Sequence, residues 1–114
     1  MPYIHISLPK TLAAPAKKEL ASSLGSLISI LPNKSERGLM IRIDDGCGMY
    51  FRGVEGADCA YVDVRLYMTT PDDKKAEFAS AFLEAFSRIV GIPADCVYMS
   101  FLEYGNWVSA GAFK

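Results

Sequence analysis

The sequence repeats itself with an offset of about 58 residues, and this repeat is the strongest constraint on its fold. Alignment of the chain with itself at this offset needs no gap, and the hydrophobic pattern of the two copies agrees. The identical pairs are few and include Tyr3/Tyr61, Leu8/Leu66, Thr11/Thr69, Lys17/Lys75, Glu19/Glu77, Ala21/Ala79, Ser22/Ser80 and Ser29/Ser87. We therefore predict one domain over residues 1–114, built from two similar units at residues 2–56 and 57–114.

Each unit begins and ends with a predicted strand. In residues 3–8, and again in residues 61–66, aliphatic residues alternate with more polar ones. A period of two with β-branched residues is typical of a strand. The second strand of each unit is predicted at residues 39–43 and 97–101, where the same composition returns.

A helix is predicted between the two strands of each unit, because apolar residues there recur every three or four positions. The helical stripe consists of Leu20, Leu24, Leu27, Ile28 and Leu31 in the first unit and Phe78, Phe82, Phe86 and Ile89 in the second.

The second helix has marked start and stop signals. Thr69 or Thr70 is the expected N-cap, Pro71 lies in the expected first turn, and Asp72 and Asp73 follow at the positive end of the helix. Gly91 is expected to end the helix, with Pro93 just beyond it.

These elements predict an α/β (α+β) fold with a four-stranded sheet and both helices on one face. A strand–helix–strand unit pairs its two strands in parallel with a right-handed crossover. The other face of the sheet is then uncovered and needs a second subunit. Short strand-like pieces near residues 49–51 and 110–113 could pair with neighbouring subunits at the sheet edges. A cyclic trimer satisfies these demands, although the pattern alone does not choose three subunits over two.

Composition excludes several classes of function. The 114 residues are 51% hydrophobic and 22% charged, with a formal net charge of −1 and no basic block, which argues against a nucleic-acid partner. No apolar run reaches the roughly 18 residues of a membrane span. The first residues lack the pattern of a secretory signal, so a cytoplasmic protein is expected. Cys47, Cys59 and Cys96 fit neither a disulfide framework nor a zinc pattern, so no metal or cofactor is expected.

The amino-terminal Met1-Pro2, followed at once by a strand rich in Ile and Tyr, resembles the tautomerase superfamily. Residues 92–98, Ile-Pro-Ala-Asp-Cys-Val-Tyr, are similar to the branch that contains macrophage migration inhibitory factor (MIF) and phenylpyruvate tautomerase. The ending at residues 112–114 also resembles 5-carboxymethyl-2-hydroxymuconate isomerase. The resemblance implies a symmetric homotrimer with an active site at each subunit interface.

The resemblance also implies a set of site residues. Pro2 corresponds to the catalytic base, Lys34 to the substrate-binding lysine and Tyr98 to the pocket tyrosine. Ser100 stands where the MIF branch has a pocket asparagine, and that branch's cysteine pair two residues apart is missing. The paired arginines of 4-oxalocrotonate tautomerase are not matched, since Met40 and Tyr98 occupy the positions that correspond to one of these arginines. A monoacid substrate is therefore expected rather than a diacid.

A free amino-terminal proline is a secondary amine and can act as a base near neutral pH. An apolar pocket beside a cation lowers the pKa of such a group, and a drop of about 1.5 units corresponds to about 2 kcal/mol. This chemistry requires removal of Met1, because the nitrogen of Pro2 is otherwise an amide. The expected reaction is a keto–enol proton transfer on a small α-keto acid such as phenylpyruvate.

Other residues are candidates for substrate binding. Arg65, with Arg42 and Arg52, could bind an anion, and Phe51 and Trp107 could line the pocket mouth or fill an interface. The alternatives are a hydroxymuconate-type isomerase and a non-catalytic trimeric binding protein of the MIF type. The only histidine, His5, is expected to serve packing.

Overall fold

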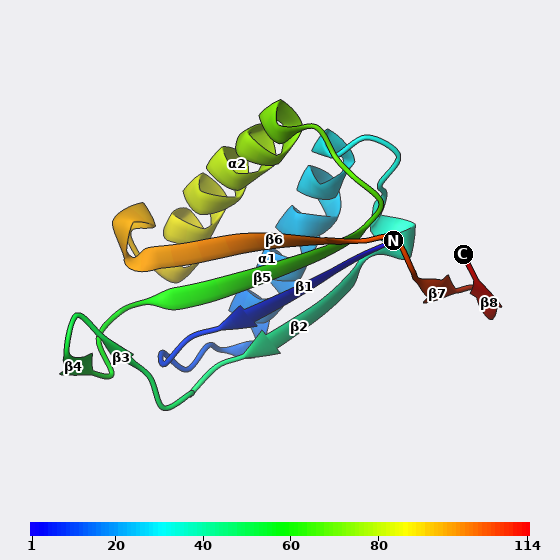
Figure 1. Cartoon of the computed structure of the whole chain (residues 1–114). Coiled ribbons are helices and arrows are strands. Elements are labelled where there is room, and N and C mark those ends of the chain that lie inside the picture. Colours follow the sequence, from blue (N-terminus) through cyan, green and yellow to red (C-terminus); the bar gives the residue numbers. More distant parts are fainter.

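The computed structural model describes residues 1–114, and its centre is one mixed four-stranded sheet (Figure 1). The strand order is β2 (Met40–Asp44), β1 (Pro2–Ser7), β5 (Ala60–Tyr67) and β6 (Val97–Tyr104). β1 and β2 are parallel, β5 and β6 are parallel, and β1 and β5 join the two units antiparallel. All four predicted strands are confirmed, with ends that move by one to three residues.

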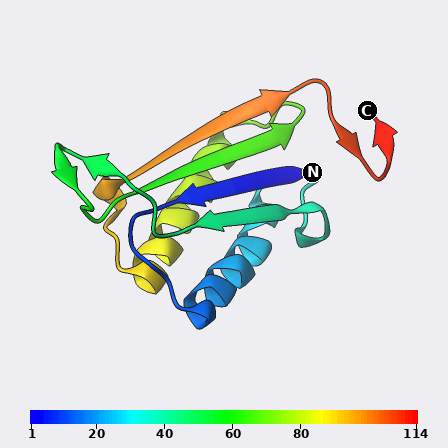
Figure 2. The same cartoon turned by 90° about the horizontal axis from the view of Figure 1, so that it is seen from below.

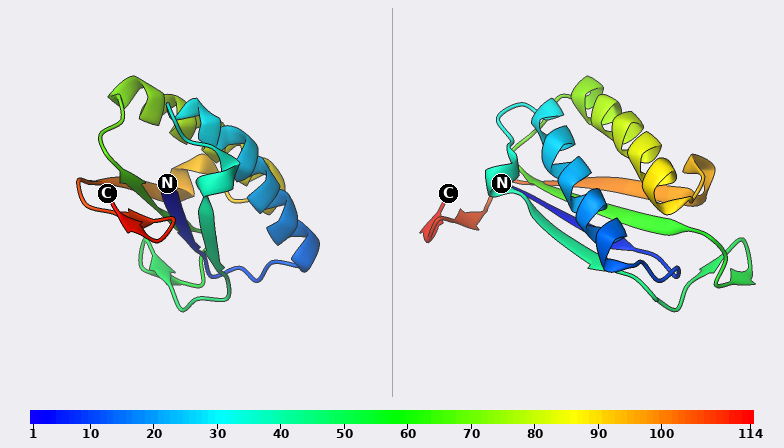
Figure 3. Two further views of the ribbon diagram at one scale, coloured as in Figure 1. Left: turned by 90° about the vertical axis from the view of Figure 1, so that its right-hand side faces the viewer. Right: turned by 180° about the vertical axis from the view of Figure 1, so that it is seen from behind.

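Two helices cover one face of this sheet, as the repeat predicts. α1 (Ala14–Leu27) follows β1, and α2 (Asp72–Val90) follows β5. Figures 2 and 3 show both helices side by side on the same face, while the opposite face is bare. The predicted α+β fold with two β-α-β units is confirmed. Neither helix is both long enough and apolar enough to cross a lipid bilayer.

The core lies between the helices and the inner face of the sheet. The three phenylalanines of α2 are fully buried and stack along the helix, with ring centroids 6.4 Å apart for Phe78 and Phe82 and 5.4 Å apart for Phe82 and Phe86. From α1, Leu20 and Leu24 are fully buried as well. The helical stripes of the sequence therefore mark the core, and only their edges, at Leu27 and Ile89, are half-exposed.

The start of α2 differs from the prediction. Pro71 occupies the N-cap position, and no side chain caps the helix. Thr70 is instead buried, and its backbone N–H donates a hydrogen bond of 2.6 Å to the carboxylate of Glu103. A distant carboxylate thus replaces the local threonine cap, which sequence spacing does not reveal. The other end is as predicted, because Gly91 ends the helix with a φ of 83°.

The strand-like pieces outside the sheet form two short hairpins. β3 (Tyr50–Phe51) pairs with β4 (Val54–Glu55), and β7 (Val108–Ser109) pairs with β8 (Ala112–Phe113). The hairpins project beyond opposite ends of the sheet (Figures 1 and 2). Three short 3₁₀ turns complete the chain: η1 (Ile28–Ile30), η2 (Glu36–Gly38) and η3 (Ala94–Cys96).

Large exposed hydrophobic side chains are confined to the bare side and the hairpins. None of them lies on α1 or α2. The set comprises Met40, Tyr61, Tyr98 and Leu102 on the sheet, Met68 just after β5, and Tyr50, Val54, Val108 and Phe113 on the hairpins. The bare face also carries polar contacts: a hydrogen bond of 2.7 Å between His5 and Asp44 and an ion pair between Arg65 and Asp63.

Candidate active site

The amino terminus lies in a cavity at one end of the sheet. Pro2 begins β1, is buried, and is paired with Leu66 of β5. The cavity has a volume of about 720 Å³ and is bounded by three segments: the first three residues, η2 with its flanking residues, and the chain from Trp107 to the carboxyl end. Figure 3 shows the amino terminus beside η2 and close to the hairpin of β7 and β8. Segments far apart in the sequence therefore meet at Pro2.

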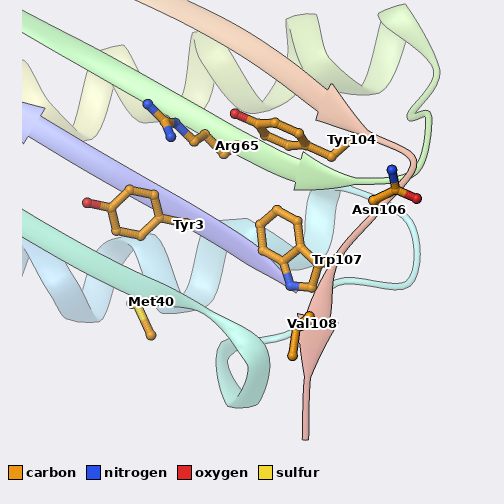
Figure 4. A pocket seen from close by; sticks show the side chains of 7 residues that line it. All are labelled: Tyr3, Met40, Arg65, Tyr104, Asn106, Trp107 and Val108. Carbon is orange, nitrogen blue, oxygen red and sulfur yellow. The ribbon is translucent and has the colours of Figure 1, made fainter. Parts of the chain in front are cut away.

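A second hollow of about 460 Å³ adjoins this cavity on the bare face of the sheet. The two share Tyr3, Met40, Trp107 and Val108 as lining residues. The other residues around the second hollow are Arg65, Tyr104 and Asn106 (Figure 4). Trp107 thus lies at the boundary of both spaces, with its ring 5.9 Å from that of Tyr104 and 6.4 Å from that of Tyr67. Its function in substrate binding or in an interface stays a prediction.

The electrostatics of the cavity favour a neutral amine. Burial lowers the pKa of the Met1 α-amino group, and the positive charge of Lys34 lowers it further. Burial also lowers the pKa of Lys34, while the negative charge of Glu103 opposes that change. The ammonium of Lys34 donates a hydrogen bond of 3.1 Å to the carbonyl oxygen of Tyr67, and this bond holds the cation near the amino terminus.

Met1 itself occupies part of the cavity. Its thioether sulfur accepts a hydrogen bond from the hydroxyl of Ser109, and its main chain lies against Gly38, where a Cβ atom would be 3.4 Å from the Met1 nitrogen. Removal of Met1 would leave this space empty. It would also move the α-amino group by one residue, about 3.8 Å along the chain, to the buried position of Pro2.

Arg65 is close to the site but already has a partner. Its guanidinium lies 3.1 Å from the carboxylate of Asp63, and this contact raises the pKa of Arg65. The side chain lines the hollow on the bare face rather than the cavity that contains Pro2.

Two further candidates, Phe51 and Tyr98, lie at the opposite end of the sheet, and a third, Ser100, lies near its middle, opposite Asp63. Tyr98 is opposite Tyr61 in the register, whereas Pro2 is opposite Leu66. The five residue steps from Tyr61 to Leu66 correspond to about 17 Å along a strand. Within one chain, Tyr98 is therefore remote from Pro2.

The remote residues form a cluster of their own. The rings of Phe51 and Tyr98 meet edge to face at 5.6 Å, and the hydroxyls of Ser100 and Tyr61 are 2.5 Å apart. Tyr98 is 63% exposed. The predicted site residues are thus separated in the chain: Pro2, Lys34, Arg65 and Trp107 lie at one end of the sheet, and Phe51 and Tyr98 lie at the other. Ser100 lies near the middle, with its hydroxyl bound to Tyr61.

Sequence reasoning missed several residues around Pro2. Arg37, on η2, lines the cavity, as do Asn33, Ser35 and Ser109. The spacing of Arg37 three residues after Lys34 is the one signal that could have suggested it. No group of three or more His, Cys, Asp and Glu side chains is arranged to hold a metal ion, and the three cysteines are free thiols.

Fold and topology together define the class of protein: the chain has the tautomerase fold in its MIF-like form. No protein-family model matches the sequence, and no curated protein shows significant sequence similarity to it. The similarity is found among solved structures.

Leishmania major MIF2 is one such structure. It superposes with a TM-score of 0.90 at 21% identity, with 100% of this chain and 97% of that chain covered. A MIF homologue from Prochlorococcus marinus has a TM-score of 0.77 at 25% identity, with 97% of both chains covered.

Two further solved structures are similar as well. Pt0534, solved after inactivation by 2-oxo-3-pentynoate, has a TM-score of 0.86 at 18% identity, with 96% of this chain and 93% of that chain covered. A fused 4-oxalocrotonate tautomerase, solved as an asymmetric trimer, has a TM-score of 0.80 at 13% identity and covers 96% and 94% of the two chains.

Proposed function

We propose that this protein is a tautomerase that transfers a proton between carbon and oxygen of a small 2-oxo acid, with the nitrogen of Pro2 as general base. One observation carries the proposal: Pro2 is buried beside a cavity in which burial and the charge of Lys34 both lower the pKa of the terminal α-amino group, here that of Met1. A terminal amine moved to Pro2 would lie in the same surroundings, and a lowered pKa raises the fraction of the neutral amine that can accept a proton. The proposal requires a chain from which Met1 has been removed.

The reaction has two proton transfers and no net change in atoms. The neutral amine of Pro2 takes a proton from the carbon next to the keto group, and the negative charge moves to the keto oxygen. The ammonium of Lys34 stabilises that enolate, since two of its N–H donors remain beyond the bond to Tyr67. The protonated amine then returns the proton to the oxygen, which yields the enol.

The second half of the site is proposed to come from a neighbouring copy. Tyr98, and Phe51 beside it, are too far from Pro2 in the same chain to touch a small substrate, and the Ser100 hydroxyl is bound to Tyr61. They belong to the bare face and its hairpins, where all the large exposed hydrophobic side chains also lie. Assembly into a homotrimer through this face would bring Tyr98 of one subunit to the cavity of another.

The solved structures support the substrate class and the assembly. 2-Oxo-3-pentynoate, which inactivates Pt0534, contains the carboxylate and the keto group of a 2-oxo acid. The fused 4-oxalocrotonate tautomerase forms an asymmetric trimer. The rival function is a trimeric binding protein without turnover, and the place of the Met1 side chain in the cavity favours it wherever Met1 is retained.

Mass spectrometry of the purified protein separates the two functions. A mass that includes Met1 contradicts the enzyme, because Pro2 then has no basic nitrogen. A mass without Met1 is followed by an assay of phenylpyruvate tautomerisation with wild type and Pro2→Ala. We expect Pro2→Ala to lower kcat/KM by about 10²-fold or more. Undiminished turnover in Pro2→Ala would show that the base is another group.

Mixed trimers test whether the site is shared between subunits. Pro2→Ala and Tyr98→Phe are each expected to be nearly inactive, and they are unfolded together in equal amounts and refolded. Half of the subunits then supply Pro2 and half supply Tyr98, so about one quarter of the sites regain both residues. If Pro2 and Tyr98 acted within the same chain, the mixture would regain no activity.

A further inference from the structure

The only charged side chains in the wall of the cavity that contains Pro2 are cationic. Arg37 and Lys114 line it, and no aspartate or glutamate side chain does. Lys34 adds a third positive charge close to the amino terminus. The cavity is therefore suited to more negative charge than one carboxylate brings.

Arg37 has no partner within the chain. Its guanidinium makes neither an ion pair nor a hydrogen bond, whereas Arg42, Arg52 and Arg65 are each paired with an aspartate. A guanidinium presents several N–H donors in a planar fork that matches a carboxylate in two parallel hydrogen bonds. The unpaired donors at the cavity wall can therefore accept a carboxylate from a ligand.

Contacts of the neighbouring residues position the backbone of η2 beside the amino terminus. Arg37 is the middle residue of η2, and the preceding Glu36 packs its carboxylate against Gly25 of α1, where a Cβ atom would collide with it. The following residue, Gly38, lies against the Met1 nitrogen. The Arg37 side chain is exposed and lines the same cavity as Pro2, so its donors are accessible to a ligand there.

We propose that Arg37 binds a second carboxylate of the substrate and so selects a dicarboxylic 2-oxo acid over a monoacid. This inference rests on the proposed tautomerase function and narrows its substrate class. Lys34 binds the enolate oxygen or the carboxylate next to the keto group, and Arg37 binds the distal carboxylate. The expectation of a monoacid substrate did not take Arg37 into account, because η2 comes to lie beside Pro2 only in the folded chain.

Two substrates that differ by one carboxylate test the proposal: phenylpyruvate and 4-carboxyphenylpyruvate. Wild type without Met1 is compared with Arg37→Gln, Arg37→Lys and the matched control Arg88→Gln, which replaces another arginine without an ion pair, on the outer side of α2. We expect wild type to prefer the dicarboxylate. Arg37→Gln should lower kcat/KM for the dicarboxylate about tenfold or more, mainly through KM, and change it less than twofold for phenylpyruvate.

The variants distinguish charge from structure. Arg37→Lys should recover part of the preference, and Arg88→Gln should leave both substrates unchanged. An equal loss for both substrates in Arg37→Gln, or no loss for the dicarboxylate, would overturn the role of Arg37.

Failure of the tautomerase function would be seen separately, as no turnover of either substrate by wild type. In that event, fluorescence titration of Trp107 with succinate and with butyrate measures the same selectivity without catalysis, since Trp107 is the only tryptophan and lines the cavity. Tighter binding of succinate that is lost in Arg37→Gln supports the anion site. Equal binding of both acids, or binding of neither, overturns it.

Discussion

Truncation of Leu102 to alanine should weaken the trimer without weakening the single chain to the same extent. Leu102 lies on the bare face of the edge strand β6, opposite Arg65 of β5, and is 50% exposed in the isolated chain. Assembly through this face would bury the exposed half. Its matched control is Leu83→Ala, because Leu83 is a half-exposed leucine on the outer part of α2, away from the bare face.

The size of the effect follows from the exposed fraction. Complete burial of a leucine side chain contributes about 1.5–3 kcal/mol, so the exposed half of Leu102 corresponds to about 0.7–1.5 kcal/mol per subunit. Alanine would still bury part of that surface, but each trimer contains three copies of the substitution. The expected loss in the free energy of association is therefore about 2–3 kcal/mol per trimer. Since 1.4 kcal/mol is a factor of ten, the association constant should fall about 30- to 150-fold.

Sedimentation over a dilution series measures this change. Wild type should sediment as three chains of 12.5 kDa at micromolar concentration, and Leu102→Ala should dissociate at a higher concentration than wild type. Leu83→Ala should follow the wild-type curve. A wild-type protein that is monomeric at micromolar concentration, or equal curves for both variants, would refute the bare face as the interface.

Three further predictions concern the core, a buried hydrogen bond and the base. Phe82→Ala should lower the free energy of unfolding by about 3–5 kcal/mol and Phe82→Leu by less, as measured by chemical denaturation, because Phe82 is 1% exposed. Hydrogen bonds from the Thr70 backbone and from Lys75 lower the pKa of Glu103 in the folded chain. The ionised carboxylate therefore stabilises the fold above the unfolded pKa of about 4.3, and this stabilisation is lost as the pH falls through the lower pKa of the folded chain. Urea midpoints of Glu103→Gln between pH 6 and pH 3 should therefore change less with pH than those of wild type, and identical slopes would contradict this. Lys34→Gln should move the acid limb of the pH profile of kcat/KM to higher pH, because the charge of Lys34 lowers the pKa of the terminal amine. An acid limb at the same pH in both proteins would show that Lys34 does not affect the pKa of the base.

Local periodicity was enough to predict the helices and strands. The alternation in β1 and β5 and the phenylalanine stripe of α2 appear in the fold with shifts of only a few residues at the ends. Periodicity succeeds because each element buries one face, and burial imposes a repeat of two residues on a strand and 3.6 on a helix. Periodicity does not predict contacts with residues that are distant in the sequence. The carboxylate of Glu103, and not a neighbouring threonine side chain, accepts a hydrogen bond from the backbone before α2.

The composition of the candidate site depended on tertiary contacts. The sequence indicated Pro2 and Lys34, and these two lie at the same end of the sheet. It gave no reason to prefer the unpaired Arg37 over Arg65, and it did not show that Tyr98 belongs to the far end. The spacing of similar residues along the chain reveals which face of a helix or strand a side chain occupies. Its partners across the cavity come from segments up to a hundred residues away, so the pairing of charges and the distances between groups exist only once the chain is folded.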